Sequence, residues 1–353
     1  MSVIIAILIF GLIVTVHEFG HFICAKLSGI RVLEFSVGMG PKLLQKTKGE
    51  TKYSLRLLPL GGYCAMEGED ATTEDPRSFR NAKLWKRMVV LVAGAGMNFV
   101  LGFVVLVVFV ASMPGIGSMV IGDFRKSTNE DNVTEYCAES LETGLQKGDK
   151  LLEVNGTKIY SIIDINYVLY GDQREKNTVL VERDGEEVTL NNVVFNDKSK
   201  TNEPFDFYLL ARKKNPLTVM QTAGEEFMSM SHIIGISLKK IFSGNVEKED
   251  VSGPVGVVSA ISESTENTQS LREIMFNLLY MTALITINVG IFNLLPIPGL
   301  DGGRLLFCFI ELVRRKPVKP EHEGYVHLAG MALLFGIMIF ATYNDIIRLV
   351  KGG

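Results

Sequence analysis

The stretch H-E-F-G-H, residues 17–21, interrupts an apolar run that extends from Val3 to Ala25. On a helix, positions four apart lie about 40° apart around the axis, so His17 and His21 project from one face. Charged and ionisable side chains are costly within a membrane span and mark sites there. The stretch therefore predicts a membrane-crossing helix that carries a polar site on one face.

Two imidazoles on one helix face can bind one metal ion, and zinc is bound in this way in the H-E-x-x-H pattern. In that pattern the carboxylate takes a proton from the metal-bound water, which is the logic of metallopeptidases. The alternative is that His17 and His21 are core residues with ordinary partners. Only five histidines occur in 353 residues, which makes a chance match rare. We expect a zinc site at the two histidines, with Glu18 as the catalytic base.

A catalytic zinc usually has three protein ligands and one open position. The segment N-L-L-P-I-P-G-L-D-G-G-R, residues 293–304, ends a later apolar run. Its prolines and glycines should break the helix and aim Asp301 inward. By itself Asp301 would be an ordinary surface residue at a helix boundary, but beside H-E-x-x-H we expect it to be the third ligand.

The composition indicates a membrane protein with a sizeable polar domain, since 47% of residues are hydrophobic and 21% are charged. No basic run with interleaved aromatic residues suggests a nucleic-acid partner. The four cysteines lack C-x-x-C spacing, so neither a zinc ribbon nor a disulfide framework is indicated. Four segments reach the length of about 20 apolar residues that a span needs, namely Val3 to Ala25, Met88 to Met113, Ile274 to Leu300 and Tyr325 to Asn344.

Basic residues gather on one side of these spans. None precedes the first span, which argues against a cleaved signal peptide. Lys26 and Arg31 follow the first span, Arg87 precedes the second, and the connection from the third to the fourth is also basic. The positive-inside rule places these connections in the cytoplasm. Both termini and the segment of about residues 114–272 are then expected outside the cytoplasm.

Two segments between the first two spans, Phe35 to Pro41 and Tyr53 to Tyr63, have the character of short strands punctuated by glycine. Irregular backbone is tolerated at membrane depth only where protein or water covers it, so we expect these strands to fold against the spans around the site. An ordinary cytoplasmic hairpin is the alternative. A sheet edge at this place could pair with an unwound substrate strand and present its peptide bond to the metal.

The second span contains Gly94, Gly96 and Asn98. A Gly-Ala-Gly sequence is more typical of close helix packing than of chemistry. Asn98 could also face the site.

The segment outside the membrane changes in character. Residues 144–156 read G-L-Q-K-G-D-K-L-L-E-V-N-G, and Asp184-Gly185 predicts a type I′ hairpin turn between strands at residues 178–183 and 186–190. The run resembles the PDZ domains of bacterial envelope proteases, which bind extended peptides or chain ends by strand addition. The alternative is a domain that only shields the membrane site sterically.

Residues 216–242 are amphipathic and too charged to span, so they are expected to lie along the outer interface. Residues 252–256 should then turn the chain toward the third span. The expected division is residues 1–113 for the first two spans and the hairpin region, 114–214 for the PDZ-like domain, 215–272 for the interfacial linker, and 273–353 for the last two spans.

The motifs H-E-x-x-H, N-x-x-P-x-P-x-L-D-G from residue 293 and P-L-G-G-Y from residue 59, with one PDZ-like insert, together resemble the site-2 protease family, specifically its bacterial regulator of sigma-E protease group. The resemblance covers essentially the whole chain. It implies a polytopic α-helical membrane protein with four transmembrane helices, a membrane-associated β-hairpin region and an extracytoplasmic PDZ-like α+β domain. The expected location is the bacterial cytoplasmic membrane.

The resemblance implies a zinc-dependent intramembrane endopeptidase that performs regulated intramembrane proteolysis. Its substrates would be single-pass membrane proteins, either anti-sigma factors already trimmed by another protease or signal-peptide remnants. By matching position, His17, His21 and Asp301 would be the Zn²⁺ ligands and Glu18 the base. The lipid bilayer and a peptide at the PDZ-like domain complete the implied partners.

Three further residues are implied to bind substrate, namely Asn293, Gly61 and Gly62, and for Asn293 a contact with the active-site backbone is the alternative. Two departures from the family pattern occur, since Met39 stands where relatives often have Phe in G-F-G-P, and Ala95 stands where they have Pro in G-P-x-x-N. Neither position is an expected ligand.

Two rival functions belong to other classes. A non-catalytic membrane scaffold that captures envelope peptides would have no metal requirement. A transporter is disfavoured, because the two halves of the chain show no internal repeat.

Overall fold

The computed structural model describes residues 2–69, 73–128, 134–171, 176–195, 205–244, 253–266 and 270–351. The chain divides into two compact units. We call residues 1–105 and 240–353 the helical unit, and residues 106–239 the sheet unit.

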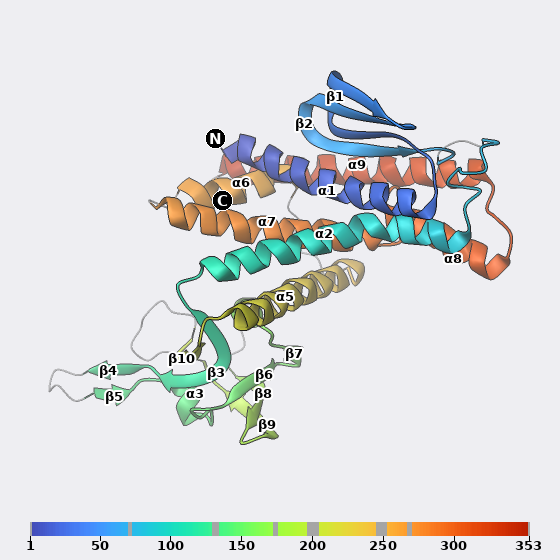
Figure 1. Cartoon of the computed structure of the whole chain (residues 1–353). Coiled ribbons are helices and arrows are strands. Elements are labelled where there is room, and N and C mark those ends of the chain that lie inside the picture. Colours follow the sequence, from blue (N-terminus) through green and yellow to red (C-terminus); the bar gives the residue numbers. More distant parts are fainter. Residues whose placement is uncertain are drawn as a thin grey trace. The chain divides into compact units, whose positions relative to one another are not determined.

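Four helices of the described chain are long and apolar enough to cross a membrane, judged by length and composition. Each lies on one of the four segments expected from the sequence, as a polytopic membrane protein requires. Each contains a long, strongly apolar window, which is the pattern of a span rather than of a surface helix. They are α1 (Ser2–Ser28), α2 (Leu84–Ser112), α7 (Leu271–Leu294) and α9 (Pro320–Lys351) (Figure 1).

The third apolar run is not helical to its end. Helix α7 ends at Leu294, and α8 (Asp301–Arg314) begins at Asp301. Pro296 and Pro298 between them lack a backbone N–H and cannot continue a helix. The expectation of a span reaching Leu300 is therefore wrong at its end, whereas the break expected from the prolines is present.

Strands β1 (Val32–Lys48) and β2 (Thr51–Met66) are much longer than the short strands expected. They pair antiparallel, and shifts in register allow Phe35 to pair with both Tyr53 and Cys64. The hairpin thus folds on itself, so that residues 62–66 form one edge and residues 42–48 the other. Helix α1 lies against β2, where a Cβ added to Gly11 would lie 3.2 Å from the carbonyl carbon of Pro59.

Helix α6 (Pro254–Glu266) stands where the sequence predicts only a turn at residues 252–256. Residue 252 lies outside the described part, and the helix begins two positions later. The Oδ2 atom of Asp345 accepts hydrogen bonds from the backbone N–H groups of Gly253 at 3.0 Å and Gly256 at 2.7 Å. These donors would otherwise be orphans at the helix start. Helix α6 packs against α1, α7 and α9, so tertiary contacts stabilise a segment of weak local pattern.

The sheet unit is built on a twisted antiparallel sheet with strand order β10-β3-β6-β8-β9, with β7 paired to β6. Two short helices, α3 (Glu139–Glu142) and α4 (Ile162–Gly171), accompany it, and β4 (Lys126–Thr128) pairs with β5 (Thr134–Tyr136). Its core includes Ile121, Phe124, Leu151, Val179 and Val181. The strands are β3 (Ile116–Phe124), β6 (Lys150–Val154), β7 (Thr157–Lys158), β8 (Asn177–Arg183), β9 (Glu186–Val193) and β10 (Phe207–Arg212).

The G-L-Q-K-G-D string has a clear structural use. Asp149 is fully buried, and its carboxylate accepts two hydrogen bonds from Arg183, at 2.7 Å from Nε and 2.8 Å from Nη2. A buried carboxylate is tolerated because this bidentate pair compensates it. The turn expected at Asp184-Gly185 is confirmed, since both residues have positive φ angles, 54° and 85°.

Helix α5 (Pro216–Phe242) has the bounds expected from its amphipathic pattern. Arg212 at the end of β10 donates from Nη1 to both oxygens of Glu225, at 2.9 Å and 2.7 Å. This ion pair joins the helix to the sheet. All four cysteines are free thiols, as their spacing predicts.

Candidate metal centre

Helix α1 places His17 and His21 one turn apart on a single face. Their ring centroids lie 4.8 Å apart, and the residues are only 8% and 6% exposed. Burial of two histidines within an apolar helix requires partners for their ring nitrogens.

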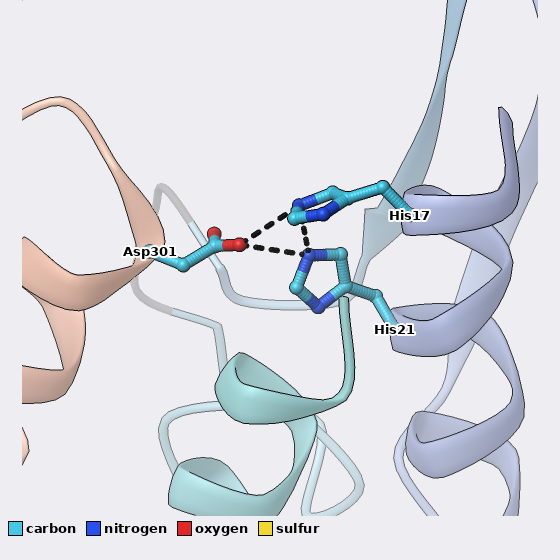
Figure 2. A group of neighbouring side chains, drawn as sticks. All are labelled: His17, His21 and Asp301. Atoms are coloured by element: carbon cyan, nitrogen blue, oxygen red, sulfur yellow. Dashed lines mark hydrogen bonds and ion pairs between the residues drawn. The ribbon is translucent and has the colours of Figure 1, made fainter. Parts of the chain in front are cut away.

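Asp301 approaches this pair from the first residue of α8, 284 positions later in the sequence (Figure 2). Its Oδ2 atom lies 2.9 Å from His17 Nε2 and 3.1 Å from His21 Nε2, and the two Nε2 atoms are 3.1 Å apart. Among the described residues this is the one group of at least three His, Cys, Asp or Glu side chains placed to hold a metal ion. Neighbouring ligand atoms of a tetrahedral zinc are about 3.3 Å apart, so the triangle is close to the size that the ion needs.

The loop before α8 is packed so that Asp301 has a fixed position. Gly299 has a φ of 97°, and its N–H donates to His327 Nδ1 of α9 at 2.9 Å. A Cβ on Gly303 would lie 3.0 Å from the carbonyl carbon of Ile297, so only glycine permits this close approach.

Helix α2 orients both imidazoles. His21 Nδ1 lies 2.8 Å from the carbonyl oxygen of Val90, which can only accept, so Nδ1 carries the proton and Nε2 keeps a lone pair. His17 Nδ1 lies 3.2 Å from the Asn98 side-chain amide. The amide oxygen of Asn98 is buried and has no partner among the described residues. A half-turn of the amide would let this oxygen accept from His17 Nδ1–H, which again directs Nε2 at the centre.

Gly94 leaves the space in which an ion would lie. A Cβ added there would be 2.7 Å from His17 Nε2 and closer still to His21 Nε2. Val90, Gly94 and Asn98 are spaced by four, so one face of α2 supplies an acceptor, an open space and an amide. A metal ion with nitrogen and oxygen ligands fits three features of this site. They are the Nε2 lone pairs of the two histidines, the unpartnered amide oxygen of Asn98 and the space at Gly94.

Glu18 is held by the edge of the hairpin. Its Oε2 atom accepts a hydrogen bond from the backbone N–H of Cys64 in β2 at 2.9 Å. One carboxylate oxygen is thus fixed by the N–H of Cys64, which lies on the edge formed by residues 62–66 and has no strand partner there.

The model of peptidase family M50 matches residues 5–337. The chain belongs to peptidase family M50. The match extends from the first span into the fourth, and so includes all three residues of the centre. The site-2 protease resemblance seen in the motifs is confirmed.

Relatives of this peptidase are similar along its whole length. A Fusobacterium nucleatum protein whose name carries the words zinc metalloprotease is 34% identical over 355 residues, with 99% of each chain covered. The zinc metalloprotease RasP of Bacillus licheniformis is 30% identical, and the regulator of sigma-W protease RasP of Bacillus subtilis is 29% identical, each with 99% of both chains covered.

The three residues expected to bind substrate all make contacts within the protein itself. A Cβ on Gly62 would be 3.5 Å from the carbonyl carbon of Ser36, so it lies within the hairpin sheet, and the carbonyl oxygen of Gly61 is 3.5 Å from Thr15 Oγ1 of α1. Asn293 donates from Nδ2 to the carbonyl oxygen of Val289 at 3.0 Å, within its own helix. Their contact with substrate stays a prediction.

Sequence reasoning passed over two features of the centre. The sequence predicted that Gly94 serves helix packing. The contact of Val90 with His21 could not be predicted, because it uses a backbone carbonyl, which every residue has. The available signal was the spacing of four from Asn98, the single polar amide in an otherwise apolar span.

Proposed function

We propose that this chain is an intramembrane endopeptidase whose Zn²⁺ is held by His17, His21 and Asp301 and whose general base is Glu18. The observation that carries the proposal is the convergence of three ligand atoms within 4.8 Å of one another, from segments on or beside membrane-spanning helices. The family and the names of its relatives identify a metalloprotease that uses Zn²⁺. The assignment of residues to roles is our inference from the geometry.

The chemistry follows from this arrangement. When bound, Zn²⁺ supplies Lewis acidity, which polarises a substrate carbonyl and makes water acidic near neutral pH. Glu18 removes the proton from that water and later returns it to the leaving amine. The hydrogen bond from Cys64 holds one of its oxygens and leaves the other for the proton. Val90 and Asn98 hold the imidazoles in the ligating tautomer.

The hairpin supports a route for substrate presentation. Residues 62–66 pair with residues 32–37 on one side, and no described strand pairs with their other side, where the N–H of Cys64 contacts Glu18. A substrate helix that unwinds could add as a strand at this edge, with its peptide bond beside the base. Leu43, Leu44 and Leu57 are 54% to 68% exposed, which fits a hairpin that contacts lipid or an apolar substrate.

The substrates we propose are single-pass membrane proteins, chiefly anti-sigma factors that another protease has already trimmed. The name of the Bacillus subtilis relative, regulator of sigma-W protease, supports this class. Signal-peptide remnants have the same single apolar helix and are the second class. The reaction would then be regulated intramembrane proteolysis.

Within the sheet unit, residues 114–214 would act as a PDZ-like domain, and residues 215–272 would form the interfacial linker. Strand β10 lies at one end of the sheet order, and Tyr208 and Leu210 on it are 54% and 49% exposed. Such an edge supports the binding of an extended peptide by strand addition. The distribution of basic residues supports an extracytoplasmic position for this domain and both termini.

The test is zinc content together with cleavage of a model transmembrane substrate by the full chain in detergent. Glu18→Gln should abolish cleavage and retain zinc, whereas Asp301→Ala should lose both. Zinc-free wild-type protein that cleaves nothing but captures peptides would favour the membrane scaffold. Full cleavage by Glu18→Gln would refute the assignment of the base.

A further inference from the structure

A second polar site lies in the helical unit, away from the metal centre. A partly open cavity of about 230 Å³ is bordered by the loop at residues 79–80, the first turns of α2 and α8, and the first turns of α9. None of His17, His21 and Asp301 lines it. Its volume is several times the about 30 Å³ of one water and below the range of about 300 Å³ and more for drug-sized ligands. The cavity has the size of a small polar group.

Three guanidinium groups line this cavity, those of Arg80, Arg87 and Arg304. Two carboxylates, Glu69 and Glu323, also line it, and each pairs with one of these arginines, Glu69 with Arg304 and Glu323 with Arg80. Clustered arginines present rigid forks of N–H donors that match phosphate oxygens.

The ion pairs of the cavity use only part of the arginine donors. Arg80 Nη2 contacts Glu323 Oε2 at 3.4 Å, and Arg87 Nη1 contacts Glu311 Oε2 at 2.8 Å. The Nε atoms of Arg80 and Arg87 are both buried, with no acceptor among the residues that the structure describes. The Arg87 side chain is only 10% exposed. Buried guanidinium donors without acceptors are costly, so these atoms indicate an acceptor that the described residues do not supply.

The position of the cavity indicates which kind of molecule supplies the acceptor. Arg87 lies in the first turn of α2 and Glu323 in the first turn of α9, so the cavity lies at the ends of two candidate spans, where the headgroups of a bilayer are expected. Trp85, two residues before Arg87 in α2, is 58% exposed, as expected for a residue at the membrane interface. Met331 lines the cavity and Leu328 beside it is 61% exposed, which offers an apolar path for acyl chains.

We propose that this cavity binds the phosphate group of an anionic phospholipid, with Arg80, Arg87 and Arg304 as its donors. The proposal does not rest on the peptidase assignment, although Gly299 and His327, which hold the loop before Asp301, also line the cavity. Free phosphate shares the same chemistry and is separated from lipid by the experiment below.

The test is native mass spectrometry of the full chain in detergent, titrated with phosphatidylglycerol or phosphatidylcholine of identical acyl chains, with and without inorganic phosphate. Wild type should retain one phosphatidylglycerol in preference to phosphatidylcholine. Arg80→Gln should weaken this binding about five- to tenfold, because one cationic donor is lost. Displacement of the lipid by millimolar phosphate would support the same site with free phosphate as its occupant.

Two matched variants make the test specific. Glu323→Gln breaks the same ion pair as Arg80→Gln but removes a negative charge, so it should strengthen lipid binding. Arg77→Gln removes the same charge from the same loop outside the cavity, where Arg77 pairs with Glu50 at 2.8 Å, and should leave binding unchanged. Equal weakening by Arg80→Gln and Glu323→Gln would mean a structural ion pair only. That result, or equal binding of the two lipids, would overturn the proposal.

Discussion

The Nε2 atom of His17 lies 2.9 Å from Oδ2 of Asp301, although 284 positions separate the two residues. A helix before the hairpin and a helix after the third span therefore share one polar centre. The ion pairs that the described residues form at His17, His21 and Asp301 are with one another. The fold of the helical unit and the binding of a metal ion are consequently linked.

Removal of the metal should destabilise the wild-type protein. A chelator is expected to lower the melting temperature by about 4 °C or more, since a ligand that binds only the folded state stabilises it. Asp301→Ala should melt near the chelated wild type and respond little to chelator. Differential scanning fluorimetry in detergent measures both, and equal chelator responses of the two proteins would contradict the ligand role.

Gly94→Ala should prevent metal binding without unfolding the protein. The added Cβ would lie 2.7 Å from His17 Nε2, in the space where the ligand atoms converge. We expect at least a tenfold loss of zinc affinity and the loss of cleavage.

Gly96→Ala is the matched control for this change. The same methyl group is added two residues away, and a Cβ there meets no atom within 4 Å. Zinc content measured by plasma emission should be unchanged in this variant. If both alanines retained zinc equally, the space at Gly94 would have no role in the site.

Asn98→Ala should weaken the site without removing a ligand. The amide beside His17 Nδ1 fixes the ring, and partners of this kind are worth about 10- to 100-fold in metal affinity or activity. Asn98→Asp should restore most of the loss, since a carboxylate also accepts from Nδ1–H. Zinc competition titrations of the three proteins test this, and an Asp variant as weak as the Ala variant would count against an acceptor role.

Glu226 makes the stability of the sheet unit depend on pH. Burial raises the pKa of this carboxyl from 4.5 to about 7, with further repulsion from Asp164 and Glu225, while Ser161 opposes the shift by hydrogen bonding. Between pH 4.5 and about 7 the folded state keeps a proton that the unfolded state has released. Stability contributed by this group is therefore full below pH 4.5 and is lost as the pH rises to about 7.

Glu226→Gln removes this penalty and should be more stable than wild type at pH 8, by about 1 to 3 kcal/mol, with little difference at pH 4.5. The neighbouring Glu225→Gln should give no such gain, because Glu225 pairs with Arg212. Hydrogen exchange of the α5 amides in the full chain reports the difference. A Gln variant no more stable than wild type at pH 8 would show that the carboxyl is not strained by burial.

Several elements could be predicted from the sequence because their signals are local. The four apolar runs have the length of spans. The amphipathic pattern of residues 216–242 predicted the bounds of α5, and Asp184-Gly185 predicted a hairpin turn. Helix α6 was missed since its helical state depends on contacts with three other helices and on Asp345, which is far away in the sequence. The lengths of β1 and β2 were also underestimated, because the two strands pair with each other in more than one register, and this folding of the hairpin has no short-range pattern.

By itself, the sequence determined the spans and the shared helix face of His17 and His21, and it predicted Glu18 as the general base and Asp301 as the third ligand. Those inferences rest on helix geometry and on the cost of ionisable groups in apolar segments, both of which are properties of a short stretch. Only the tertiary structure decided that Asp301 reaches the histidines, that Gly94 leaves room between them, that Val90 and Asn98 orient the rings, and that Cys64 holds Glu18. These contacts join segments distant in sequence through backbone groups and empty space, which no local pattern encodes.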